Sequence, residues 1–518
     1  MRLSRGLVAA ASGLLVAVSG CTSSQDTAAD PSASASSAPA APQAAEIAWS
    51  DCDAEISGLL AGQPGSERDL AFECGRTEVP ISYDEPQGDT LPLFLVRARW
   101  AQQTDRIGSL VINPGGPGAS GADAAIGSAL TLPEDVLRRF DVVGFDPRGV
   151  GLSTPVECIP PELKDRIMAA EPRPATPEQI DEAFALQQEV ADGCAEKYPD
   201  SLGAFNTVDT ARDMDLLRQS LGDEQLTYLG YSYGTTLGST YAELFPDRVR
   251  ALVLDAAVDP DEDPRADAEQ QTTSLEASFD AFAANCTGLV AGCPLGPDPR
   301  RFVEELLDQA TTAPIPSALA GETRQATPGV IMTAVLSALY STDSWPQLAQ
   351  GLAAARNGDS QQLFSLADSY SGRLQDGTYT NLLDANQAIN CADTDPATAV
   401  PEEEIRTLAT EWGQRFPLFG AGSAVGLNTC TGWDAERTPL PERDAEGAAP
   451  ILVIGNSGDP VTPLPGAVDM AEDLTSGVLL TWQGQGHTAY PKTDCVTGAV
   501  DAYLIDLVVP QDGMTCPA

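Results

Sequence analysis

A serine in a glycine-framed turn is the residue of this chain best placed to act as a nucleophile. Ser232 lies at the centre of the sequence Gly-Tyr-Ser-Tyr-Gly, between an apolar run and a helical pattern. A sharp turn from a buried strand into a helix exposes the serine hydroxyl, and Gly230 and Gly234 let the two elements pass closely. The helix that follows also directs its positive dipole end at developing negative charge. We therefore predict that Ser232 attacks a carbonyl group.

Composition restricts the choice of a general base. His487 is the only histidine among 518 residues, and it follows the apolar run 478–482. A lone histidine is often structural, but a serine nucleophile needs a base close to it. We predict that His487 accepts the proton of Ser232.

Two aspartates compete for the third position of a Ser-His-Asp triad. Asp459 follows the apolar run 451–455 and precedes His487 by 28 residues, whereas Asp255 ends the run after the Ser232 helix. The chain order Ser, Asp, His and this spacing favour Asp459. Its predicted role is to hold the imidazole tautomer and to stabilise the imidazolium.

Hydrogen-bond donors for an oxyanion are expected from two places. One is the main-chain N–H of Tyr233, directly after Ser232, and the other is Gly116 in the sequence Asn-Pro-Gly-Gly-Pro-Gly at 113–118. Successive glycines let main-chain amides approach a substrate oxygen without an intervening side chain. A phosphate-binding loop is the alternative, but the lysine and glycine spacing of a P-loop are missing.

The elements that must position these residues form an alternating pattern. Short apolar runs predict strands buried on both faces of a parallel sheet, with helices such as 210–221 and 235–245 between them. These runs are 109–113, 141–146, 226–230, 251–255, 451–455 and 478–482.

A different pattern separates the fourth run from the fifth. Residues 260–445 show helical spacing and no convincing strand, so we predict a mostly helical cap inserted between core segments 46–259 and 446–518. The helical patterns within it are 299–310, 329–341, 346–357 and 401–415.

The N-terminus indicates export. A basic start, an apolar stretch and the sequence Val-Ser-Gly-Cys at 18–21 predict a signal peptide over 1–20 and lipid attachment at Cys21, as in a bacterial lipoprotein. Residues 21–45 are rich in Ser, Ala and Pro, which predicts a disordered tether. No later run is apolar enough to cross a membrane, so we expect a lipid-anchored protein on the extracytoplasmic side, with partial secretion as an alternative.

Charge and cysteine content restrict the kinds of ligand and cofactor that the protein is expected to bind. The net charge of −46 argues against nucleic acid as a ligand, because a phosphate backbone needs basic neutralisation. Ten cysteines remain after Cys21, without metal-ligand spacing, which indicates five disulfides and neither a metal nor another cofactor. Sequence leaves their connectivity open, and pairing of nearest neighbours is our working hypothesis: 52–74, 158–194, 286–293, 391–430 and 495–516.

The chain resembles the prolyl-aminopeptidase-like S33 peptidases of the α/β-hydrolases, and most of all the secreted tripeptidyl aminopeptidases of actinobacteria. The resemblance rests on segments 113–118, 144–153, 230–234, 388–393, 458–463 and 486–487, which occur in the expected order. It implies an α/β-hydrolase fold with a helical cap, and release of short peptides, in particular tripeptides, from free N-termini. The chain has Asn-Pro-Gly-Gly-Pro-Gly where prolyl aminopeptidases have His-Gly-Gly-Pro-Gly, which favours the tripeptidyl branch.

The same resemblance suggests roles for two further residues. Asp393, in the sequence Ala-Ile-Asn-Cys-Ala-Asp at 388–393, is the candidate for binding the substrate α-ammonium, and Arg148 is expected to brace its loop through a buried ion pair. We expect a monomer. A carboxylesterase or lipase is the alternative enzyme, and a lipoprotein that binds a ligand through a degenerate hydrolase fold is the alternative outside catalysis.

Overall fold

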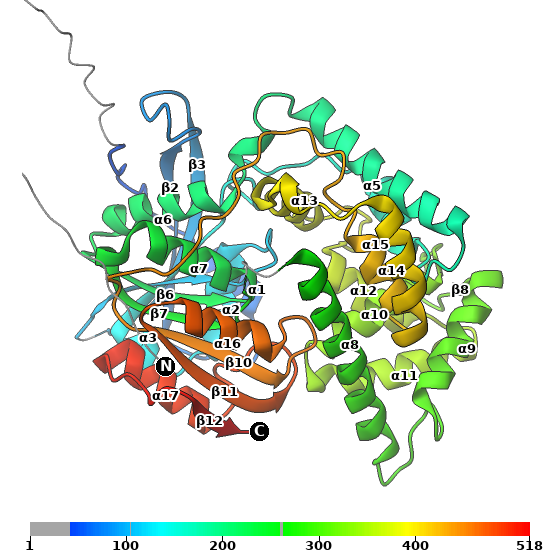
Figure 1. The fold of residues 1–518 in the computed structure, drawn as a ribbon. Coiled ribbons are helices and arrows are strands. Elements are labelled where there is room, and N and C mark those ends of the chain that lie inside the picture. Colours follow the sequence, from blue (N-terminus) through cyan, green and yellow to red (C-terminus); the bar gives the residue numbers. More distant parts are fainter. Residues whose placement is uncertain (1–41, 104, 260–262) are drawn as a thin grey trace, which may run out of the picture. The chain divides into compact units, whose positions relative to one another are not determined.

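A ten-stranded sheet runs through the part of the chain that the computed structural model describes, which is residues 42–103, 105–259 and 263–518. The strand order is β1-β2-β3-β5-β4-β6-β7-β10-β11-β12, antiparallel from β1 to β5 and parallel from β5 onward (Figure 1). The bounds are β1 Ser50–Asp51, β2 Leu70–Pro80, β3 Thr90–Trp100, β4 Gly108–Asn113, β5 Phe140–Phe145, β6 Leu226–Tyr231, β7 Val249–Asp255, β10 Ile451–Gly458, β11 Gly477–Gln485 and β12 Met514–Pro517. The predicted signal peptide, Cys21 and most of the tether fall outside the described residues.

Each face of the sheet is covered by helices. Alternate residues of β4 show the division: Leu110 and Ile112 pack toward α2, α3 and α17, whereas Val111 packs toward α6, α7 and α16. Burial on both faces is why the parallel strands are continuous apolar runs. The bounds are α1 Asp53–Leu60, α2 Gly121–Thr131, α3 Glu134–Arg139, α6 Thr207–Leu221, α7 Tyr233–Leu244, α16 Leu464–Asp473 and α17 Asp494–Asp506.

Six strands predicted from apolar runs are present with bounds shifted by a few residues, but the β2–β3 hairpin was not predicted. In β3, buried Leu93 and Leu95 alternate with less buried neighbours, and the strand also carries Arg97 and Arg99. A search for continuous apolar runs misses a strand of this kind, because only one of its faces is fully buried.

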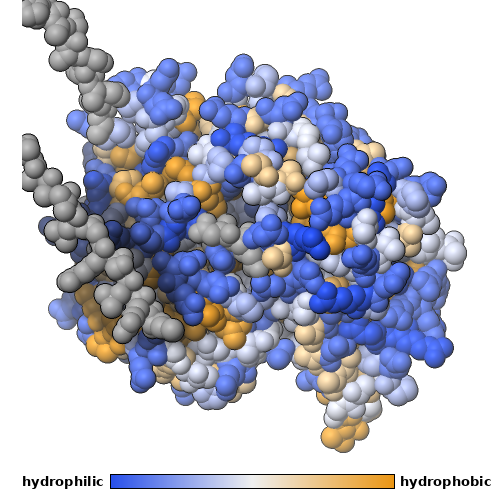
Figure 2. All heavy atoms as spheres, viewed as in Figure 1, coloured by the Kyte–Doolittle hydropathy of each residue, from blue (hydrophilic) through white to orange (hydrophobic). Residues whose placement is uncertain are grey.

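Helices occupy most of the chain between β7 and β10. They are α8 Pro264–Thr287, α9 Pro299–Thr312, α10 Pro328–Leu339, α11 Trp345–Arg356, α12 Gln361–Ser371, α13 Leu382–Asp393, α14 Glu402–Arg415 and α15 Gly420–Gly426. A short antiparallel pair, β8 Ile315–Pro316 with β9 Gln325–Ala326, was not predicted. The end of α8 forms an apolar tip on an otherwise mostly hydrophilic face, and Leu289 and Val290 are exposed in the loop after it (Figure 2).

A chain segment from before β6 also packs against these helices. The segment after β5 forms α4 (Pro161–Ala169) and α5 (Pro177–Lys197), and Ile180 of α5 packs with Leu408 and Trp412 of α14. The sequence pattern assigns this segment to the core segment 46–259, but its packing places it with the helical region. Its amphipathic pattern does not show which apolar surface it covers.

Five disulfides join the ten described cysteines as nearest neighbours in sequence, which confirms the working hypothesis. The pairs are Cys52–Cys74, Cys158–Cys194, Cys286–Cys293, Cys391–Cys430 and Cys495–Cys516. Among the described residues, no helix combines the length and the apolar character that a membrane span requires.

Disulfides that close longer loops should contribute more to stability, with the logarithm of the loop length. Cys391–Cys430 closes 39 residues and Cys286–Cys293 closes 7, so the entropic model gives about 4 and about 2 kcal/mol. We expect the Cys391→Ala/Cys430→Ala variant to lose more thermal stability than Cys286→Ala/Cys293→Ala, as measured by calorimetry. Equal losses would contradict the model, and alkylation of unreduced, denatured protein that starts at residue 46 should find no free thiol.

Candidate active site

The candidate nucleophile lies on a strained turn between β6 and α7. Ser232 has φ +56° and ψ −126°, and its N–H donates to the carbonyl oxygen of Asp255 at 3.0 Å. A Cβ on Gly230 would lie 2.3 Å from the carbonyl oxygen of Gly234, and a Cβ on Gly234 would lie 2.8 Å from that of Asn113. The two glycines therefore allow a turn that no larger residue permits, as the sequence pattern predicts.

The glycine loop 113–118 follows β4 and packs directly against this turn. A Cβ on Gly115 would lie 2.9 Å from the Cβ of Ser232, and Gly115, Gly116 and Gly118 all have positive φ. Within the described part of the chain, the N–H groups of Gly116 and Tyr233 have no hydrogen-bond partner. Two unpaired donors therefore lie beside Ser232, where the sequence predicts an oxyanion hole.

A buried carboxylate holds the imidazole of His487. The Nδ1 atom lies 2.9 Å from Oδ2 and 3.0 Å from Oδ1 of Asp459, and Asp459 also accepts hydrogen bonds from the N–H groups of Val461 and Thr462. Burial alone would raise the pKa of Asp459, but His487 and these amide donors together hold it below its ordinary value. The carboxylate therefore stays ionised beside the imidazole.

The rival aspartate has different partners. The Asp255 carboxylate is fully buried and accepts the N–H groups of Ala489, at 2.9 Å, and of Tyr490, at 2.7 Å. Burial raises the pKa of Asp255 to about 6, although these amide donors oppose the rise. Asp255 thus binds the main chain of the loop that carries His487, whereas Asp459 contacts the imidazole itself.

The helical region also contacts this loop. The N–H of His487 donates to the carbonyl oxygen of Tyr340, at the end of α10, at 2.9 Å. The two rings meet edge to face, with centroids 5.1 Å apart. A Cβ on Gly486 would lie 2.8 Å from the same carbonyl oxygen. Tyr340 lies in none of the sequence motifs described above, so this contact could not be predicted from the sequence.

A cavity of about 830 Å³ opens beside Ser232. Gly116 and Tyr233 line it, as do Tyr340 and Thr462, which both contact His487. The other wall comes from the helical region and from the segment after β7, and it includes Asp259, Asp267, Asn386, Asn390, Asp393 and Asp395. No lysine or arginine is among the described residues that line the cavity, and its carboxylates make it acidic.

Asp393 lines this cavity, but its carboxylate already has partners. One oxygen accepts the N–H of Thr207 at 2.9 Å, and the other accepts the Thr207 hydroxyl at 2.6 Å. The Tyr233 hydroxyl bonds to the same Thr207 oxygen. Burial raises the pKa of Asp393 to about 7 against the opposing effects of Thr207 and Arg443. Its charge is therefore poorly balanced, and lone pairs on both oxygens remain available.

A second carboxylate of the cavity was not predicted. Burial and the nearby charge of Asp259 raise the pKa of Asp267, in the first turn of α8, to about 6. Neither residue belongs to a motif, so only the fold brings them together with Asp393. Carboxylates held together in an acidic site favour a cationic ligand.

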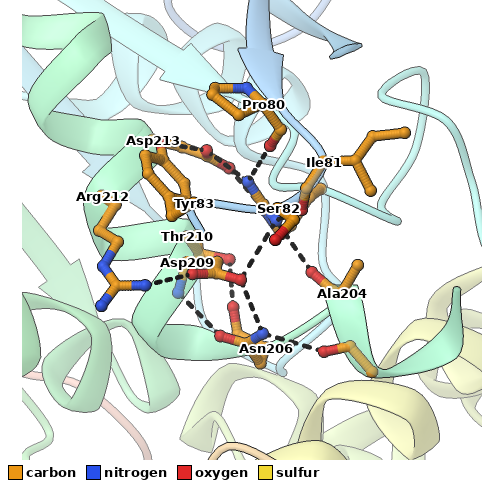
Figure 3. A network of polar contacts seen from close by, with 12 residues as sticks. Pro80, Ile81, Ser82, Tyr83, Ala204, Asn206, Asp209, Thr210, Arg212 and Asp213 are labelled. Atoms are coloured by element: carbon orange, nitrogen blue, oxygen red, sulfur yellow. Dashed lines mark hydrogen bonds and ion pairs between the residues drawn. The ribbon is translucent and has the colours of Figure 1, made fainter. Parts of the chain in front are cut away.

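Arg148 forms the predicted buried ion pair, but its partner Asp213 lies on α6. Its fully buried guanidinium donates to both oxygens of Asp213 at 2.8 and 2.6 Å, and also to the carbonyl oxygens of Pro80, Ile81 and Ala204. Figure 3 shows this network, in which Tyr83 also donates to Asp213. Since α6 begins at Thr207, the network fixes the residue that Asp393 and Tyr233 contact.

Comparisons with known proteins agree with this geometry. A family model described as the alpha/beta hydrolase fold matches residues 108–492. The serine protease Hip1 of Mycobacterium tuberculosis is 39% identical over 460 residues, covering 86% of this chain and 87% of that protein. A carboxylesterase B of the same organism is 35% identical, covering 86% of each chain. A tripeptidyl aminopeptidase of Streptomyces lividans is 29% identical, covering 91% of this chain and 87% of that protein. The chain therefore belongs to the α/β-hydrolase fold family.

Proposed function

We propose that this protein is a serine peptidase that releases short peptides, in particular tripeptides, from free N-termini. The observation that carries the proposal is the placement of Ser232 beside two unpaired amides, at the edge of an acidic cavity. The similarity to a serine protease and to a tripeptidyl aminopeptidase supports the same activity.

In this mechanism the Ser232 oxygen attacks the scissile carbonyl carbon while His487 takes the hydroxyl proton. Asp459 holds Nδ1 of the imidazole, which leaves Nε2 for proton transfer, and it stabilises the resulting imidazolium. The N–H groups of Gly116 and Tyr233 bind the oxyanion. His487 then gives the proton to the leaving amine, and a water molecule, deprotonated by His487 in turn, hydrolyses the acyl-enzyme.

Recognition of a free N-terminus is assigned to the acidic wall of the cavity. A buried α-ammonium needs a carboxylate partner, because desolvating an unpaired charge is costly. Asp393 is our candidate, since burial raises its pKa to about 7 against the opposing effects of Thr207 and Arg443, and its oxygens retain free lone pairs. A bound ammonium would supply the missing positive charge.

Carboxylester hydrolysis is the second candidate function. Its support is the similarity to a protein named carboxylesterase B, together with the ability of a Ser-His-Asp triad to attack esters as well as amides. The acidic cavity wall favours a cationic peptide terminus over a neutral acyl chain.

We also propose that the protein is exported and anchored by lipid at Cys21. The signal-like residues 1–20 support this proposal, as does the disulfide pairing of all ten other cysteines, which is typical of oxidising compartments.

The triad makes a prediction about non-additive losses. Ser232→Ala, His487→Ala and Asp459→Asn should each lower kcat by roughly three to six powers of ten, and Ser232→Ala/His487→Ala should be about as inactive as either single variant. Steady-state kinetics on a chromogenic tripeptide substrate would measure this, with circular dichroism to verify folding.

Asp255→Asn is the matched control for the assignment of Asp459 as the aspartate of the triad. Its amide would present donors to the N–H groups of Ala489 and Tyr490, so we expect a loss of about tenfold, far smaller than that of Asp459→Asn. If Asp255→Asn were as damaging as Asp459→Asn, our choice of the catalytic acid would be wrong.

Acetylation of the substrate tests the aminopeptidase activity. Blocking the α-amine of a tripeptide substrate should lower kcat/KM by roughly two powers of ten or more, about 3 kcal/mol, and Asp393→Asn should lose much of this discrimination. Equal cleavage of free and acetylated peptides would exclude the aminopeptidase and leave an esterase or an endopeptidase.

The pH dependence gives an independent measurement of the same contact. Because the pKa of Asp393 is raised to about 7, its carboxylate becomes neutral as the pH falls below that value, and its ion pair with the substrate ammonium is lost. Log kcat/KM for the free peptide should therefore fall more steeply with decreasing pH than log kcat/KM for a neutral ester, by about one unit of slope. Identical slopes would show that Asp393 does not hold the ammonium.

The anchor is tested by phase partitioning. Cys21→Ala should move the protein from the detergent phase to the aqueous phase or the medium, because the sulfur that carries the lipid is lost. Equal partitioning of variant and wild type would contradict lipid attachment at this residue.

A further inference from the structure

One face of α13 presents a row of polar side chains to the cavity. Asn386, Asn390 and Asp393 are spaced by four and three residues, so they lie one above another on the helix, and all three line the cavity beside Ser232. Asn390 belongs to the family-like segment 388–393 and is exposed, although neither asparagine has a role in the triad or the oxyanion hole.

The hydrogen bonds along this face fix the orientation of both amides. The carbonyl oxygen of Pro117 can only accept, so Asn386 must present its Nδ2 to it, at 3.1 Å. The Oδ1 atom of Asn386 then faces Asn390, which must in turn present its own Nδ2, also at 3.1 Å. Among the described residues, no group donates a hydrogen bond to the Oδ1 atom of Asn390. This acceptor belongs to a residue that lines the cavity.

The row is rigidly placed relative to the candidate oxyanion hole. A Cβ on Gly118 would lie 2.7 Å from the carbonyl oxygen of Leu382 and 2.9 Å from the nitrogen of Asn386, so the glycine loop touches the helix backbone. The disulfide Cys391–Cys430 tethers the helix directly after Asn390. An acceptor held this firmly loses little entropy when it binds a donor.

We propose that the side-chain carbonyl of Asn390 binds the peptide substrate, by accepting a hydrogen bond from a main-chain N–H on the N-terminal side of the scissile bond. The inference rests on the proposed peptidase function and extends it. After cleavage the leaving peptide must exit, whereas the acylated N-terminal part stays in the cavity that Asn390 lines. Asp393, about one turn further along α13, then faces the α-ammonium, and Asn390 faces the second or third residue. Asn386 is a positioning residue that acts through Asn390.

A thermodynamic cycle between enzyme and substrate tests this contact. The substrates are a tripeptide with a chromogenic leaving group and two matched forms, N-methylated at the second or the third residue, which removes one main-chain N–H. In the wild type, one of the two methylations should lower kcat/KM by roughly three- to tenfold, the scale of one neutral hydrogen bond. In Asn390→Ala the parent substrate should lose a similar factor, and the same methylation should then cost little more.

Two further variants give this cycle its controls. Asn386→Ala should weaken the coupling, because Asn390 is then free to rotate its amide. Asn357→Ala removes an exposed asparagine at the end of α11, away from the cavity lining, and should preserve the full cost of methylation. Titration with a small fluorophosphonate counts reactive Ser232 in each variant, so that rates refer to competent enzyme.

The outcomes separate this inference from the proposed function. If both methylations cost Asn390→Ala as much as they cost the wild type, Asn390 makes no such bond and the inference is overturned, while peptide cleavage by the wild type leaves the proposed function intact. A wild type that does not cut the unmethylated parent overturns both.

Discussion

Close backbone contact at the glycines of the loop 113–118 is the constraint on which the site depends. Gly115 lies against the Ser232 turn, and Gly118 lies against the first turn of α13, so the glycine loop is held between two elements far apart in sequence. A methyl group at either position would separate these elements by several tenths of an ångström or more. Since oxyanion donors must lie within hydrogen-bond distance of the reacting oxygen, a displacement of this size would weaken them. The same contacts set the distance between Ser232 and the wall of the cavity.

The helical region completes the site as well as covering it. The carbonyl of Tyr340 fixes the main chain of His487, and Thr207 joins the carboxylate of Asp393 to the hydroxyl of Tyr233. A shift of α10 would therefore move the candidate base, and a shift of α13 would act on the residue that carries a candidate oxyanion donor. Access to the cavity and the alignment of the reacting groups are coupled by these few hydrogen bonds.

The sequence predicted those parts of the site that require an unusual residue type. The glycines around Ser232, the sole histidine and the aspartate of a strand-end turn each have few alternatives, and the structure brings Asp459 and His487 into contact as expected. The six buried strands were predictable for the same reason, since few other structures explain continuous apolar runs. The β2–β3 hairpin, the position of α5 and the partners of Asp393 were not predictable. Tyr340, Asn386 and Asp267 are ordinary residues on ordinary helices, and only the path of the chain between distant segments gives them a place in the site.

The disulfide pattern has a consequence for how the chain can be made. Each bridge closes before the next cysteine pair begins, so no bridge encloses or crosses another. An oxidant that joined cysteines in their order of emergence during translocation would reach this pairing without reshuffling, provided that Cys21 took no part. If Cys21 kept a free thiol, it could pair with Cys52, and each later cysteine would then pair with the wrong neighbour. Attachment of lipid to the Cys21 sulfur would prevent this mispairing.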